Sequence, residues 1–366
     1  MRKLALAGYL MLSGFVLLWV GCQNPALTGA KVYIQQQDWD NAREQLEIAV
    51  QQEPGNAEAH YLLGRAYGEQ GNYEAMVREF QTSVEISGTW EKDIKSFREE
   101  KWVMAFNRGV QAGKEEDFQK AAEEFKTATI IDSQNPDAFN NLGFAYTNLG
   151  RFDEALEAYG KVDEIQPGNV AAKINSGVIY FNRDEFQRAK ELFQEALEVE
   201  PENKSALTMC ALALERLARE RRAGLQATST KEDSLQIHEQ TWSLLNQVVA
   251  VYEQGIQAHP EDKDFAYNLG VLYAQEFKNF QAAVHMFQKV TEMDANDVDG
   301  WYNLATAQLA LGDLEGAQPS LERVIELEPD NSIAWYQLGI IYIKKGMKAE
   351  GEEAFKRAEE LTGEGE

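Results

Sequence analysis

The sequence predicts an all-α solenoid of about nine helix-turn-helix repeats after an N-terminal signal segment, and three observations carry this prediction. The stretch 135–169 aligns with 169–203 at a constant offset of 34 residues, which places Gly143 on Gly177. A small residue recurs in the first helix of every copy, and proline recurs where second helices should end. A fixed period of this length is typical of proteins that stack one helical pair on the next. We therefore expect repeats to fill residues 26–362.

The first residues have the pattern of an export signal. Arg2 and Lys3 are the only charges among the first 30 residues, and the run from Leu4 to Val20 is nearly all apolar. The run is about as long as the shortest membrane-spanning helices. An uncleaved anchor, an ordinary cleaved signal and a lipoprotein signal are therefore the three alternatives.

The cysteine that follows favours the lipoprotein signal. The residues Val20-Gly21-Cys22 resemble the end of the bacterial lipobox, in which the cysteine is acylated and becomes the new N-terminus. This resemblance implies a signal peptide over 1–21 and a lipidated Cys22 with a short tether over 22–25. Because Gln23 rather than Asp follows the cysteine, it also implies the outer membrane, facing the periplasm, as the site of anchoring.

The repeats can be delimited by residues that recur in each copy. Nine copies lie near 26–56, 57–89, 90–135, 136–169, 170–203, 204–262, 263–297, 298–331 and 332–362. The small first-helix residues, expected where the two helices of one repeat cross closely, are Ala30, Gly64, Gly109, Gly143, Gly177, Ala211, Gly270, Ala305 and Gly339. Large second-helix residues, expected to fill the layer between repeats, are Leu46, Phe80, Phe125, Tyr159, Phe193, Tyr252, Phe287, Leu321 and Phe355.

Prolines mark the expected ends of second helices because proline cannot continue a helix. The prolines in this position are Pro54, Pro167, Pro201, Pro260 and Pro329. Pro319 is an exception that falls early in a second helix, where it is tolerable only near the first turn.

Two repeats are longer than the period. The third has 11 extra residues, and we expect its first helix to be capped by Thr89 and to run from about Trp90 to Ala112. The sixth has 25 extra residues, and we expect both of its helices to lengthen into a projecting hairpin arm joined near 224–231.

The recurring residues resemble those of the tetratricopeptide repeat family over nearly all of 26–362. This resemblance implies a right-handed α-solenoid whose first helices line a concave groove that binds other proteins. The sequence has no Gly-rich phosphate loop and no nucleophile elbow, and HEQTW at 238–242 lacks the second histidine of a metal-binding helix. We therefore expect no enzyme, no cofactor and no metal site.

A row of amides is the main candidate for binding in that groove. The residues of this row, one per first helix, are Asn107, Asn141, Asn175, Asn268, Asn303 and Gln337, and Leu62 and Met209 interrupt it. An amide offers donors and an acceptor, so the row is suited to hold an extended peptide backbone of any sequence. It resembles the asparagine ladders of O-GlcNAc transferase and armadillo repeats. The alternative is that these amides only form local hydrogen bonds.

Two further candidates concern charge. We expect a basic arm on the projecting hairpin, formed by Arg216, Arg219, Arg221 and Arg222. It could bind an acidic partner or a lipid headgroup. The alternative is a solvated helix end, where arginines interact favourably with the helix dipole and with neighbouring carboxylates. Clamp-type family members hold carboxylates with groove Lys and Arg. Lys173 and Lys344 are the few first-helix candidates here, and Lys173 falls in a slot expected to face the core, so we expect no clamp.

The composition limits the partners. With 60 acidic against 35 basic residues the net charge is −25, which argues against nucleic acid because binding to phosphates needs clustered Lys and Arg. Cys22 and Cys210 are the only cysteines, and Cys210 is expected to be buried in the core. The expected partners are therefore other envelope proteins, with the membrane reached through the N-terminal lipid.

The predicted function is a non-enzymatic, lipid-anchored scaffold, an assembly or adaptor factor of the bacterial envelope. One alternative is a glycan-handling module of polysaccharide export, with Phe144 and Phe181 stacking on sugars. Another is an oligomerising spacer joined through the C-terminal end, where AFKRAEELTGEGE follows without a further capping helix.

Overall fold

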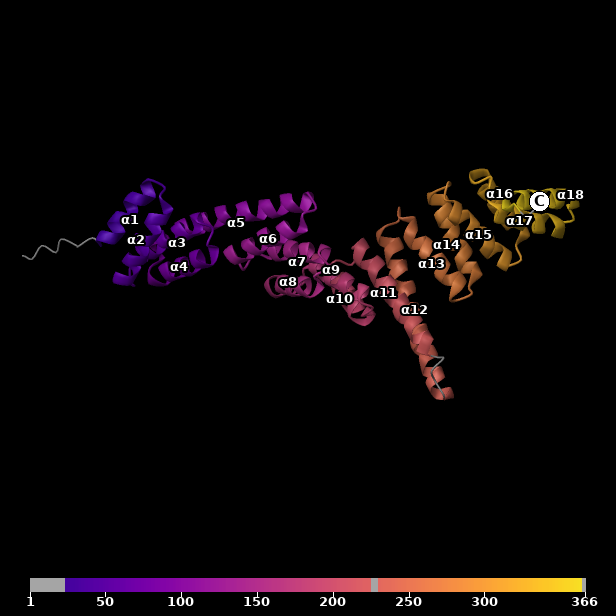
Figure 1. The fold of residues 1–366 in the computed structure, drawn as a ribbon. Coiled ribbons are helices and arrows are strands. Elements are labelled where there is room, and N and C mark those ends of the chain that lie inside the picture. The colour runs from indigo at the N-terminus through magenta and orange to yellow at the C-terminus, as the bar shows by residue number, and fades with distance from the viewer. Residues whose placement is uncertain (1–23, 225–229, 364–366) are drawn as a thin grey trace, which may run out of the picture. The chain divides into compact units, whose positions relative to one another are not determined.

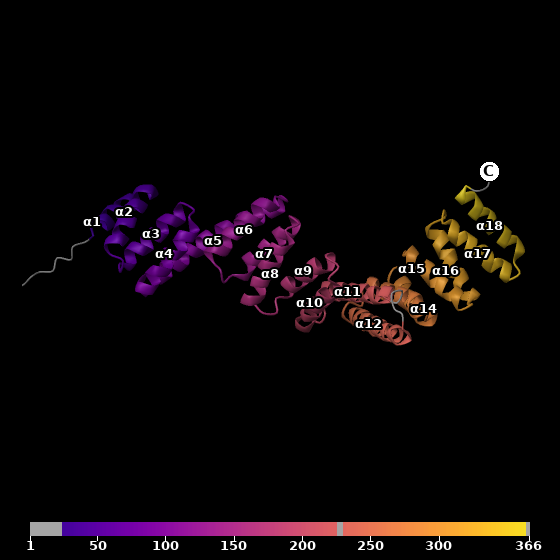
Figure 2. The same ribbon diagram turned by 60° about the horizontal axis from the view of Figure 1, so that its bottom comes forward.

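The computed structural model describes residues 24–224 and 230–363. The predicted signal peptide and the lipidated Cys22 lie outside these ranges. The chain divides into two compact units, Met1–Ala138 and Phe139–Glu366, and each unit is considered by itself. Within the described ranges the secondary structure consists of eighteen α-helices and one 3-10 helix, which confirms the all-α repeat architecture (Figures 1 and 2).

The first unit contains three helical pairs, of which the third carries the expected extension. Its helices are α1 (Pro25–Gln35), α2 (Trp39–Gln52), α3 (Ala57–Glu69), α4 (Tyr73–Ile86), the 3-10 helix η1 (Gly88–Trp90), α5 (Glu91–Lys114) and α6 (Phe118–Ile131). The expected Thr89 cap was wrong. Ser87 Oγ instead accepts a hydrogen bond from the Thr89 amide and starts η1, so that α5 begins without a side-chain cap.

The second unit contains the remaining pairs and the arm. After α7 (Pro136–Asn148), in which the division between the units falls, come α8 (Phe152–Ile165), α9 (Val170–Asn182), α10 (Phe186–Val199), α11 (Lys204–Ala223), α12 (Lys231–Ala258), α13 (Lys263–Gln275), α14 (Phe280–Met293), α15 (Val298–Ala310), α16 (Leu314–Leu327), α17 (Ser332–Lys344) and α18 (Lys348–Thr362). Figure 1 shows α12 reaching beyond its neighbours α10 and α13, as expected for a hairpin arm. No helix in the described residues is long and apolar enough to cross a membrane.

Local sequence explains where the helices start and stop. Asn56 and Asn169 cap α3 and α9, because their side-chain oxygens accept the amides of Ala59 and Ala172. The turn inside most pairs has one residue in the left-handed region, for example Gly150 at φ 71°. The five end-marking prolines each follow the end of a second helix by two residues, as the sequence predicts.

The recurring small residues lie where the two helices of one repeat come close, as the sequence predicts. A Cβ added to Gly177 would lie 2.5 Å from the ring of Phe193, in the second helix of the same repeat. The same pairing recurs as Gly64–Phe80, Gly109–Phe125, Gly143–Tyr159, Gly270–Phe287 and Gly339–Phe355. The first-helix glycine therefore admits the large second-helix side chain of its own repeat, and Phe193 also packs in one cluster with Leu207 of the next repeat.

Pro319 is placed less favourably than the sequence suggested. It is exposed and is the sixth residue of α16, beyond the first turn. A proline there cannot donate to the carbonyl four residues earlier, and its ring crowds that carbonyl.

We expect Pro319→Ala to raise the free energy of unfolding by about 1–3 kcal/mol, because an interior proline costs up to about 3 kcal/mol relative to alanine. Chemical denaturation of the variant beside the wild type measures the change. Glu157→Ala, also at an exposed helical site, is the control and should change the free energy little. An unchanged or lower stability for Pro319→Ala would contradict this.

Candidate functional site

The predicted amide row lies on first helices in both units. Asn107 is on α5 of the first unit and is exposed. The other members belong to the second unit and are partly buried: Asn141, Asn175, Asn268, Asn303 and Gln337. Most amides of the row are therefore neither fully exposed nor in the core. The hydrogen bonds that each amide already makes decide whether it can bind a ligand.

Towards the C-terminus the amides join one repeat to the next. Asn303 Nδ2 donates to the Tyr267 hydroxyl at 3.1 Å and to the Asp299 carbonyl at 2.9 Å. Gln337 Nε2 donates to the Tyr302 hydroxyl at 3.1 Å. Each tyrosine directly precedes the row position of its own helix, so the pattern is visible in the sequence as Tyr267-Asn268 and Tyr302-Asn303. Asn303 thus makes one local hydrogen bond within its own helix, and both amides donate to a tyrosine of the preceding repeat.

Asn175 also has a partner inside the fold. It hydrogen-bonds to Tyr159, and burial raises the pKa of that phenol although the hydrogen bonds to Asn175 and Thr147 act in the opposite direction. An amide held in this way orients a tyrosine and retains less capacity for a ligand.

Asn268 differs from these amides and lies beside the base of the arm. No hydrogen bond to its side chain occurs among the described residues, and it lines a cavity of about 130 Å³ between α11, α12 and α13. Arg219 and Arg222 from the arm line the same cavity. The structure therefore places one member of the amide row and two members of the basic arm around one cavity.

The charges around this cavity are unequally paired. Arg222 forms an ion pair with Glu276 on α13, and Glu215 accepts a hydrogen bond from the Tyr252 hydroxyl at 2.9 Å. The i,i+4 pair between Glu215 and Arg219, weighed as part of the solvated-helix alternative, does not form within ion-pair distance. Arg219 has no ion-pair partner in the described part of the chain. The cavity thus offers one guanidinium that makes no ion pair, although Glu215 and Glu276 line the cavity beside it, and one amide without a hydrogen bond, which together suit a peptide group or a carboxylate.

Glu215 is held in an environment that disfavours its charge. Burial raises the pKa of Glu215, and Glu276 adds to this, while the hydrogen bond from Tyr252 and the nearby Arg219 and Arg216 only partly offset it. The pKa of such a carboxyl is higher in the folded than in the unfolded protein, so its ionisation lowers the stability of the fold. The full stability is present below the unfolded pKa, and it is lost as pH rises through the folded pKa.

We therefore expect Glu215→Gln to be more stable than the wild type at neutral pH, with the difference shrinking to nothing as pH falls below the usual range of a carboxyl. The glutamine keeps an oxygen that can accept from Tyr252. Denaturation at a series of pH values checks this, with Glu157→Gln, an exposed carboxyl on α8, as the control. A pH-independent difference would show that ionisation of Glu215 is not its cause.

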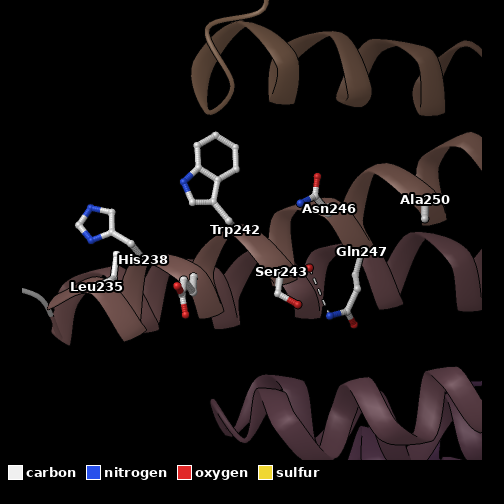
Figure 3. A pocket seen from close by; sticks show the side chains of 8 residues that line it. Leu235, His238, Trp242, Ser243, Asn246, Gln247 and Ala250 are labelled. Carbon is white, nitrogen blue, oxygen red and sulfur yellow. Dashed lines mark hydrogen bonds between the residues drawn. The ribbon is translucent and has the colours of Figure 1, made fainter. Parts of the chain in front are cut away.

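All four arginines of the arm are exposed, and Arg216 and Arg221 do not line the cavity. Figure 3 shows the outer side of α12, where Leu235, His238, Trp242 and Asn246 line a shallow surface. Trp242 is fixed at one edge by a perpendicular contact with Phe277, at 5.0 Å between ring centroids.

The remaining sequence candidates have the following environments. Lys173 is nearly buried, as expected, and pairs with both Asp163 and Glu195, while Lys344 is exposed. Cys210 is fully buried, and burial raises its pKa to about 11, which confirms an unreactive core thiol. No metal-ligating cluster occurs within the described ranges.

The two aromatic residues of the glycan alternative differ in exposure. Phe144 is 52 % exposed, whereas Phe181 packs against Phe186. Phe144 therefore exposes about half of its surface, and Phe181 is partly buried.

Sequence reasoning missed two basic residues of the first unit. Leu62 and Asn141 occupy the same position of their repeats, so Arg65 is the counterpart of Phe144 on the groove side of its first helix. It should have been counted among the first-helix cations. Its guanidinium lies 5.6–6.0 Å from the ring centroids of Trp39, Tyr61 and Phe97. Lys101 is buried and pairs with Glu69 at 2.7 Å. It escaped notice because it belongs to the inserted part of α5, which has no counterpart in other repeats.

Comparison with known proteins agrees with this architecture. Two tetratricopeptide repeat models match residues 27–85, 276–317 and 302–365, and 114–174 and 149–213, which together exceed half of the chain. The chain belongs to the tetratricopeptide repeat family. Proteins with this fold are generally scaffolds that bind other proteins rather than enzymes, so protein partners are the expectation for this member as well.

Individual relatives match only in part. The chain is 37 % identical over 75 residues to rat (Rattus norvegicus) DnaJ homolog subfamily C member 3, which is 20 % of this chain and 15 % of the relative. It is 26 % identical over 252 residues to human (Homo sapiens) protein O-mannosyl-transferase TMTC3, which is 69 % of this chain and 23 % of the relative. The tetratricopeptide repeat protein thus spans less than a quarter of these curated relatives.

One solved structure has the same fold. The C-terminal part of a repeat protein of Cytophaga hutchinsonii superposes with a TM-score of 0.53 at 18 % identity, covering 70 % of this chain and 95 % of the other. At this identity the likeness supports the fold alone.

Proposed function

We propose that this protein is a non-enzymatic scaffold, lipid-anchored in the bacterial envelope, that holds extended segments of other envelope proteins on the first-helix side of its repeats. The observation that carries the binding proposal is the cavity at the base of the arm, where Asn268 and Arg219 face one hollow without partners of their own in the described residues. An extended segment presents a backbone amide and, at an acidic residue, a carboxylate, which are the groups that this pair can bind.

The test is capture of partners from cross-linked envelopes by the wild type and by the double variant Asn268→Ala/Arg219→Ala. A charge-assisted hydrogen bond contributes about 1.5–3 kcal/mol and a neutral one about 0.5–1.5 kcal/mol, so we expect capture to weaken at least about tenfold. The matched control is Asn246→Ala/Arg221→Ala, which removes the same residue types from exposed positions of the arm. Equal capture by both variants and the wild type would exclude this cavity as the binding site.

The other row positions give an internal comparison. Asn303→Ala removes hydrogen bonds to Tyr267 and Asp299, so we expect it to lower stability near α13 and α15 more than it lowers capture. If Asn303→Ala abolished capture while the fold stayed intact, the whole row rather than the Asn268 cavity would be the binding surface.

The anchoring part of the proposal rests on the sequence Val20-Gly21-Cys22. Two or more acyl chains are needed for stable attachment, because each buried methylene contributes only about 0.8 kcal/mol. We expect Cys22→Ser to abolish metabolic labelling with palmitate and to release the protein from the membrane fraction, with Cys210→Ser as the control that retains both. Retention of the label in Cys22→Ser would contradict the lipoprotein assignment.

The exposed ring of Phe144 supports one second candidate, the handling of envelope glycans. Aromatic side chains present a flat apolar face on which a sugar can stack. Retention of envelope polysaccharide on the immobilised protein, lost with Phe144→Ala and unaffected by Asn268→Ala/Arg219→Ala, would favour this function over peptide binding.

A further inference from the structure

The junction between the second and third repeats is built differently from the others. At several other junctions the second helix of one repeat packs along the first helix of the next, as α2 does on α3 and α10 does on α11. At this junction α4 touches α5 through the edge-to-face contact of Phe80 with Phe97 but does not pack along it, and α4 contacts η1 and α6 instead. The cause is the insertion: η1 and the lengthened start of α5 stand between the two repeats, and one side of α4 loses its usual neighbour.

A groove opens where that neighbour is missing. Its volume is about 860 Å³, and its walls are α4, the first half of α5 and the turn at 132–135. Phe80 and Ile94 form a buried apolar floor, and Val84 and Val103 stand on the walls with 37 % and 42 % of their surface exposed. An apolar groove of this size lies within the range of ligand and peptide sites.

The groove also contains an unsatisfied donor. Trp102 lines it and stacks on Phe106 at 4.7 Å, but its indole Nε1–H is buried without a hydrogen-bond acceptor. A buried polar group without a partner is costly, so an acceptor brought in by a ligand would be favoured there.

The rim is acidic. The charged lining residues are Glu85, Glu91, Glu99 and Asp132 against Lys95 and Arg98. Arg98 directs its guanidinium to the Ile131 carbonyl at the end of α6, so it is already engaged within the fold. Glu91 and Glu99 have no ion-pair partner among the described residues. The groove therefore combines an apolar floor with a rim that is complementary to positive charge.

We propose that this groove binds a basic amphipathic α-helix of a partner protein. A helix can place its apolar stripe on the floor and its lysines and arginines along the carboxylates of the rim, which is how amphipathic helices occupy apolar grooves. It would take the position against α4 that a neighbouring first helix holds at the other junctions. This site lies in the first unit and is independent of the Asn268 cavity in the second.

The test uses defined peptides and the full chain. The probe is an end-blocked amphipathic peptide of leucine and lysine with five helical turns, about 18 residues. Its scrambled isomer keeps the charge but loses the apolar stripe, and a third peptide carries glutamate in place of lysine. Fluorescence anisotropy of labelled peptides gives the affinities. We expect the amphipathic lysine peptide to bind at least tenfold more tightly than either of the others.

Variants locate the binding. Val84→Arg should weaken the amphipathic peptide at least tenfold, while Ile48→Arg, an equally exposed apolar site on α2, should not. Glu91→Lys/Glu99→Lys should weaken it as well, while Glu44→Lys/Glu74→Lys, an equal charge change outside the groove, should not. Far-UV circular dichroism confirms that each variant remains folded.

A spectroscopic signal reports on the groove directly. In a protein labelled with ¹⁵N-tryptophan, the indole signal that Trp102→Phe removes should shift on addition of the amphipathic peptide. Equal affinity for the scrambled isomer, full binding by Val84→Arg, or an unmoved Trp102 signal at saturation would each overturn the proposal. Self-association of the unliganded protein that Val84→Arg abolishes would also overturn it, by identifying a second copy as the occupant.

Discussion

Replacing Phe193 with alanine is expected to lower the free energy of unfolding by about 3–5 kcal/mol, the usual range for a fully buried aromatic side chain. Phe193 has none of its surface exposed and packs in one cluster with Leu207 and Cys210 of α11. Its ring also lies against Gly177 of α9. Loss of the ring would therefore leave a cavity at a point where α9, α10 and α11 meet.

The measurement should show where in the chain Phe193→Ala lowers stability, as well as by how much. Repeat proteins are stabilised mainly by contacts between neighbouring repeats, so we expect amide hydrogen exchange to accelerate most in α9–α11 and least in α1–α4. Phe144→Ala, which truncates a half-exposed ring, is the control and should cost much less. A cost for Phe193→Ala below that of Phe144→Ala, or faster exchange spread evenly over the chain, would contradict this account.

The second large effect is an asymmetry between the partners of one buried ion pair. The Lys101 side chain is 9 % exposed, pairs with Glu69 at 2.7 Å and lies 4.9 Å above the ring of Phe97. Replacing Glu69 leaves the ammonium of the buried Lys101 without its partner, whereas replacing Lys101 leaves a carboxylate whose side chain is 26 % exposed and can be hydrated. We expect Glu69→Leu to cost about 3 kcal/mol and Lys101→Met to cost less than about 1 kcal/mol.

Chemical denaturation of both variants and of the double variant Glu69→Leu/Lys101→Met tests this asymmetry. The double variant should recover most of the stability that Glu69→Leu loses, because the stranded ammonium is gone. The neighbouring Glu100, at 3.8 Å from Lys101, is largely exposed and is expected to compensate only slightly. Equal costs for the two single variants would show that the ion pair itself stabilises the unit.

The site could be foreseen only in its parts. The period of 34 places an amide in the same slot of six helices, and the Arg cluster is plain in the stretch 216–222. Asn303 donates to the Tyr267 hydroxyl of the preceding repeat, whereas Thr208 stands in the corresponding position before Asn268. Such contacts join residues about 35 positions apart, so they are not found by reading one repeat at a time.

The sequence by itself determined the features that repeat or that act locally. Helix pairs, capping asparagines, proline-marked ends and the two lengthened repeats follow from short-range rules that each segment satisfies alone. Only the tertiary structure decided the features that need two repeats at once. It showed that each recurring first-helix glycine accommodates an aromatic ring, and that Arg219 and Asn268 line one cavity at the base of the arm. It also showed that the insertion before α5 opens a groove beside α4. The physical reason is that the sequence shows how long an insertion is, whereas the surface that the insertion exposes depends on how the neighbouring helices pack around it.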